Sequence, residues 1–163
     1  TPYIVFGLFF LFTKIKHIGV SMITLGISTA VMHGTLQYYG QWMDECSMLI
    51  ISYSAIQLID KSFPNYGYLA LIFYYMSIKE YFILFFLMFS SMQLYITYLI
   101  RQKKISFLQK ILIQQYIVSV IFGLICWLID QYLCKNINDL PFHATWHIFS
   151  AYGMFSGFLS FIL

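Results

Sequence analysis

The sequence predicts an all-α membrane protein, a bundle of seven transmembrane helices. Two observations lead to this fold class. Of the 163 residues, 61% are hydrophobic and only 9% are charged, and the apolar residues form continuous runs that do not alternate with polar ones. A soluble domain is about 45–50% apolar and about 25% charged. Continuous apolar runs in lipid are helices, because only helices and closed barrels satisfy their own backbone groups there.

Charged or proline-containing breaks divide the chain into seven apolar stretches. The first ends at Lys14, the third at Asp60 and the fifth at Arg101, while the fourth follows Pro64. The fourth is short for a full span, which needs about 20 residues. In chain order the predicted helices cover about residues 3–12, 18–38, 43–58, 66–78, 81–100, 111–133 and 142–163. We expect residues 1–163 to form one transmembrane helical domain.

Both ends of the sequence look truncated. The chain has no initiator Met, no basic segment and no small-residue cleavage site at its start, so it does not begin as a signal peptide does. Its last residues, 155–163, stop within an apolar run. We therefore expect it to be the middle of a longer protein.

The basic residues predict the orientation in the membrane. Seven of the nine lie in the loops after the first, third and fifth stretches, against two (Lys79 and Lys135) on the opposite side. Lysine and arginine favour the cytosolic side. The loops after the second and sixth stretches should then face the lumen or exterior.

Composition also excludes some functions. The net charge of +3 is small and scattered, which argues against nucleic acid as a partner. The three cysteines match no CxxC metal or redox pattern. The expected surroundings are the lipid bilayer, with no obligate protein partner evident.

Three histidines are placed to share a metal ion. His33 lies near the lumenal end of the second stretch, and His143 and His147 begin the seventh at i, i+4, on one helix face. Ionisable residues in spans are rare and normally face the bundle interior. Three neutral imidazoles with one open position are a known catalytic zinc arrangement. The alternatives are histidines that only form hydrogen bonds in the bundle core, or haem ligands.

Two carboxylates, Asp44 and Glu45, open the third predicted helix at a similar depth. Successive helical residues are about 100° apart, so both cannot aim at one metal. One should serve the site, and we interpret Glu45 as a charge at the helix start.

Further polar candidates lie on neighbouring helices. Thr29 is one turn before His33 and could donate to a substrate oxygen, or else bond back to its own helix carbonyl. Ser28 points elsewhere by about 100°. Asp130 needs a partner: a metal-ligand imidazole, a Tyr hydroxyl or a helix end, with equal weight given to each.

These residues occur in motifs that resemble those of the alkaline ceramidases. The first is Gly26-Ile-Ser-Thr29-Ala-Val-Met-His33-Gly-Thr-Leu, followed by Gln41-Trp-Met-Asp44-Glu45. The second is Trp127-Leu-Ile-Asp130, followed by His143-Ala-Thr-Trp146-His147. They span most of the chain in the family's order. The broader superfamily, with the adiponectin-receptor-like proteins, shares only the histidines, a hydroxyl and an Asp.

The resemblance implies zinc ligands at His33, His143 and His147, with Asp44 beside the water that the zinc activates. It also implies a hydroxyl at position 29, where the family usually has Ser and this chain has Thr29. Family members carry an upstream segment with a calcium site, which is absent here, and a cysteine in that segment would pair with Cys134. Calcium could therefore bind only through that missing segment.

The expected function is that of a zinc-dependent hydrolase (amidohydrolase) of sphingolipid metabolism. It would cleave the amide bond of ceramide to a sphingoid base and a fatty acid, in the membrane of the endoplasmic reticulum or Golgi. Asp44 would be the general base, and Thr29 would help stabilise the oxyanion. The rival is a receptor-like or transporter protein with a structural zinc site, and a third reading is a degenerate, inactive copy.

Overall fold

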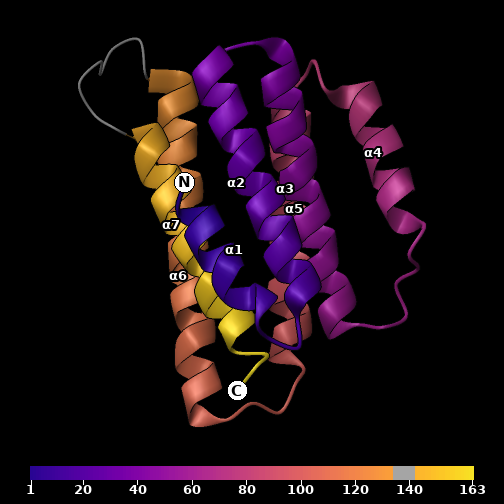
Figure 1. Cartoon of the computed structure of the whole chain (residues 1–163), viewed down its shortest axis with the longest axis vertical. Coiled ribbons are helices and arrows are strands. Elements are labelled where there is room, and N and C mark those ends of the chain that lie inside the picture. Colours follow the sequence, from indigo (N-terminus) through magenta and orange to yellow (C-terminus); the bar gives the residue numbers. More distant parts are fainter. Residues whose placement is uncertain (134–141) are drawn as a thin grey trace. The chain divides into compact units, whose positions relative to one another are not determined.

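The computed structural model describes residues 1–133 and 142–163, and this part of the chain contains seven α-helices and no β-strand (Figure 1). The all-α prediction is confirmed. In chain order the helices are α1 (Pro2–Leu11), α2 (Lys16–Thr35), α3 (Tyr38–Ile59), α4 (Gly67–Ile78), α5 (Phe82–Arg101), α6 (Phe107–Leu133) and α7 (Phe142–Leu159). Cys134 and Lys135 lie outside the described residues.

Three of these helices, α2, α5 and α6, are long and apolar enough to cross a membrane. Helices α1 and α4 are apolar but shorter, with 10 and 12 residues. At about 1.5 Å per residue, α4 is about 18 Å long against a hydrocarbon core of about 30 Å. The architecture is that of a helical membrane bundle, and α4 is indeed short for a span.

The helices form two compact units. The first contains Tyr3–Lys104, with α1 to α5, and the second Ile105–Leu163, with α6 and α7. That residues 1–163 form a single domain remains a prediction.

In the first unit, α2 and α3 form a tight hairpin. Helix α2 ends at Thr35 and is followed by Leu36, whose φ of 52° is left-handed, and Gln37 is extended before α3 begins. This turn makes α3 start five residues earlier than the predicted position 43. The prediction was wrong because residues 39–42 were left between the second and third predicted helices, although their backbone is already helical. Asp44 and Glu45 therefore lie in the second turn of α3, not at its start.

Helix α4 brings the chain from the end of α3 back towards its start, so that α5 runs parallel to α3. Tyr75 of α4 lies near the start of both helices, where its ring centroid is 5.7 Å from that of Phe85. Further along, Gln93 Nε2 donates to Ser52 Oγ at 2.8 Å. Figure 1 shows α4 at the periphery of this unit, and only Tyr75 and Ile78 of α4 are buried.

In the second unit, α6 and α7 lie side by side along their length (Figure 1). Their close approach depends on glycine. A Cβ placed on Gly123 would lie 2.9 Å from Cε3 of Trp146. The Trp146 ring instead stacks on Trp127, with centroids 5.1 Å apart and planes 13° apart. Small residues allow such close packing of helices in membranes.

The turn at Gln37 and the end of α5 at Gln102 provide a test of orientation, because α5 is parallel to α3 and ends far from the start of α3. Both side chains are exposed. In a variant with Cys46, Cys126 and Cys134 replaced by Ser, single cysteines at these two positions can be labelled in sealed membranes. An impermeant thiol reagent on the cytosolic side should label position 102 and not position 37. The opposite pattern contradicts the predicted orientation.

Candidate functional site

A buried hydroxyl–carboxylate pair joins α2 to α3 in the first unit. Thr29 Oγ1 donates to Asp44 Oδ1 at 2.5 Å, and the two residues are 2% and 5% exposed. A hydrogen bond to a charged acceptor is shorter and stronger than a neutral one. It fixes the Asp44 carboxylate on the α2 side of α3.

Thr29 and its neighbour Ser28 have different partners. The Ser28 hydroxyl donates to the carbonyl of Leu25 in its own helix at 2.9 Å. Thr29 makes its bond across to α3, so the alternative of a hydroxyl that bonds back to its own helix applies to Ser28. The 100° separation of successive residues explains the difference.

Glu45 is buried within α3 and is not the helix-start charge that the sequence predicted. It is 5% exposed, and Gln41 Nε2 donates to its Oε1 at 2.8 Å, while the Tyr75 hydroxyl donates to its Oε2 at 2.5 Å. Two donors compensate a buried carboxylate for the loss of water. Asp44 bonds to α2 and Glu45 to α4, so the two carboxylates diverge as the helical angle predicts.

Tyr75 was not among the sequence candidates. It is 1% exposed and lies thirty residues after Glu45 on the short helix α4. A tyrosine in a run of aromatic residues carries no local sign of such a long-range bond. Tyr75 could have been found only by asking which group donates a hydrogen bond to the buried Glu45 carboxylate.

In the second unit, Asp130 of α6 bonds to His143 of α7. The distance from His143 Nδ1 to Asp130 Oδ2 is 2.8 Å, and the side chains are 25% and 18% exposed. Of the three partners considered for Asp130, the structure provides the imidazole. With Nδ1–H donating to the carboxylate, the lone pair of a neutral His143 ring is on Nε2, the atom through which such an imidazole binds a metal.

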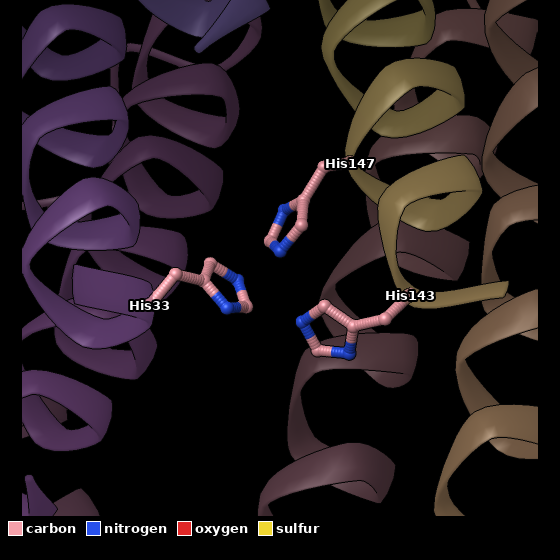
Figure 2. A group of neighbouring side chains, drawn as sticks. All are labelled: His33, His143 and His147. Carbon is pink, nitrogen blue, oxygen red and sulfur yellow. The ribbon is translucent and has the colours of Figure 1, made fainter. Parts of the chain in front are cut away.

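His147 lies one turn after His143 on α7. The two ring centroids are 4.8 Å apart and the rings meet edge to face. Figure 2 shows both side chains projecting from α7 on the same side of the helix. The i, i+4 spacing therefore places two imidazoles together, as the sequence predicts.

His33 extends from α2, one turn beyond Thr29, and its side chain is exposed (Figure 2). The first unit therefore supplies an imidazole beside the Thr29–Asp44 pair. The second supplies two imidazoles, one of them held by Asp130. Neutral imidazole is a good zinc ligand, so the chemistry of this donor set suits zinc.

Comparison with known proteins shows what the chain is similar to. A segment of 44 residues is 34% identical to an alkaline ceramidase of Arabidopsis thaliana, and it covers 24% of this chain and 17% of that protein. No solved structure matches the chain. The model of the family described as Ceramidase matches residues 10–163, nearly the whole sequence. The chain belongs to the ceramidase family.

Proposed function

We propose that this protein hydrolyses the amide bond of ceramide in a zinc-dependent reaction within the membrane. The observation that carries the proposal is the buried Thr29–Asp44 pair in a chain of the ceramidase family. A buried carboxylate that accepts a short hydrogen bond from Thr29 is suited to proton transfer.

The metal centre of this proposal consists of His33, His143 and His147. The hydrogen bond that His143 Nδ1–H donates to Asp130 supports this assignment, because it fixes the ring orientation and tautomer of His143 as outer carboxylates do in zinc proteins. Zinc would polarise the substrate carbonyl and activate a water molecule. Three histidines leave a position for that chemistry.

Asp44 is the proposed general base. It accepts a proton from water, whose oxygen then bonds to the amide carbonyl carbon. The C–N bond breaks next, and Asp44 returns the proton to the leaving nitrogen. The products are a fatty acid and a sphingoid base with a free amine. One residue can serve in both steps because the second reverses the proton transfer of the first.

Thr29 orients Asp44 in this proposal. A threonine hydroxyl has a single O–H, and here that hydrogen is donated to the carboxylate. Stabilisation of the oxyanion by Thr29, the role expected from the sequence, requires the hydroxyl to turn away from Asp44 during the reaction.

The apolar surface of the helices fits a lipid substrate that arrives from the bilayer, and 61% of the chain is hydrophobic. We propose a multi-pass protein of the endoplasmic reticulum or Golgi membrane.

The test is an assay of the purified protein in detergent with ceramide as substrate. We expect release of fatty acid and sphingoid base in equal amounts, and loss of both products when a chelator removes the metal. A protein that holds zinc and leaves ceramide intact would instead support the receptor-like or transporter alternative.

Substitution of Thr29 separates the hydroxyl from the shape of the side chain. Thr29→Val keeps the shape and removes the donor, so we expect kcat to fall about 10- to 100-fold, as for loss of a hydrogen bond to a charged group. Thr29→Ser restores the hydroxyl and should stay within about threefold of the parent, a difference of less than 1 kcal/mol. Equal activity of the Val and Ser variants would remove the hydroxyl from the mechanism.

A further inference from the structure

A polar cavity lies in the first unit, at the end of α3 that is far from Asp44. It has a volume of about 220 Å³. Its wall comes from the start of α2, the last turn of α3 and the loop that follows α3. The lining residues are His17, Gln57, Leu58, Lys61, Phe63 and Asn65. None of them takes part in the proposed hydrolysis.

A hydrogen-bond network shapes this cavity and sets the direction of its amide groups. The Tyr68 hydroxyl donates to Gln57 Oε1 at 2.7 Å. The amide nitrogen of Gln57 then donates to the carbonyl of Phe63 and to Asn65 Oδ1, both at 3.2 Å. Because its oxygen faces Gln57, Asn65 directs its NH₂ group away from Gln57. The loop is thus held in one conformation by Gln57.

The groups that remain are donors. Lys61 contributes an ammonium group, Asn65 an amide NH₂ and His17 a ring N–H. No acidic residue is among the described residues that line the cavity. Asp60 is next to Lys61, but its carboxylate accepts from the Ser62 backbone N–H at 2.9 Å, which lowers the pKa of Asp60. A cavity of donors with a cation selects an anion.

The surroundings of the cavity match the membrane interface. The cavity opens at the end of the unit where the basic loops lie, which is the predicted cytosolic side. Tyr66 is 73% exposed and Tyr98 is 57% exposed, and tyrosine is enriched at membrane–water interfaces. Val20, one turn after His17, is 56% exposed and offers an apolar surface to an acyl chain.

We propose that this cavity binds a phosphate group, with Lys61, Asn65 and His17 as its donors. Two sources carry that chemistry, the head group of an anionic lipid and free inorganic phosphate. Anionic lipids are concentrated in the cytosolic leaflet, where each lysine near the surface contributes about 1 kcal/mol to binding. The site is independent of the hydrolytic one.

The experiment measures binding to the full chain in neutral detergent, without an activity assay. One arm titrates dioctanoyl phosphatidic acid and the other titrates sodium phosphate, with sodium chloride at the same ionic strength as the reference. The readouts are the dissociation constant and the rise in the thermal unfolding midpoint, because a ligand of the folded state stabilises it.

We expect saturable binding that Lys61→Gln weakens about fivefold. Lys61→Arg should bind like the parent, and so should Lys79→Gln, which removes a lysine from the opposite end of the unit. Binding of the lipid alone identifies a head-group site, and binding in both arms identifies a general phosphate site. Failure of both arms would overturn the proposal. Parental affinity in both single variants, Lys61→Gln and Asn65→Ala, would also overturn it.

Discussion

Replacing both His143 and His147 by Ala should remove nearly all bound zinc and all hydrolysis of ceramide. These residues supply two of the three proposed ligands, and α7 presents both rings on one side. A single imidazole cannot hold zinc tightly, because catalytic zinc sites use three protein ligands. The measurement is zinc per chain by elemental analysis after purification in detergent, together with the assay of both products.

The matched control for this prediction is His17→Ala. It removes the one histidine of the sequence that is not a proposed zinc ligand, which lines the cavity near the start of α2. It should keep the zinc content and the activity of the parent. Asp130→Asn should have an intermediate effect on zinc binding. The neutral amide is a weaker partner for His143, so zinc affinity should fall about 10- to 100-fold. One zinc per chain in the double histidine variant contradicts the ligand assignment.

The helices were well predicted from the sequence, because a long apolar run between charged breaks must satisfy its own backbone hydrogen bonds in lipid and does so as a helix. It failed at residues 38–42: the second predicted helix was extended to Tyr38 and the third was begun at Met43, whereas α3 begins at Tyr38 after a left-handed residue, Leu36. A leucine in that conformation is stabilised by the hairpin around it and has no signature in the sequence. The error placed Asp44 and Glu45 at the helix start, whereas they lie in its second turn.

The candidate site was predictable to the extent that helix periodicity determines it. The i, i+4 spacing of His143 and His147 and the angle between Asp44 and Glu45 follow from 3.6 residues per turn. Partners from other helices were not predictable. Thr29 could have bonded to its own helix, and Asp130 had three possible partners until the structure joined it to His143. Glu45 was misinterpreted because Tyr75 is distant in sequence.

The second prediction with a large expected effect is the loss of activity on replacement of Asp44. In Asp44→Asn the side-chain oxygen can still accept the hydrogen bond from Thr29, so the packing between α2 and α3 should survive. What is lost is the ability to take a proton from water. We expect kcat to fall about 10²- to 10⁴-fold, the usual contribution of a general base, with zinc content unchanged.

Glu45→Gln is the matched control for this prediction. It makes the same chemical change one residue away, in a side chain equally buried. The Tyr75 hydroxyl can still donate to the amide oxygen, and the helical angle keeps position 45 directed at α4. We therefore expect a variant that keeps its zinc and most of its activity. If both variants lose activity equally while both keep zinc and fold, a single general base at Asp44 is wrong. If Asp44→Asn loses its zinc, Asp44 belongs to the metal centre itself and the proton must go elsewhere.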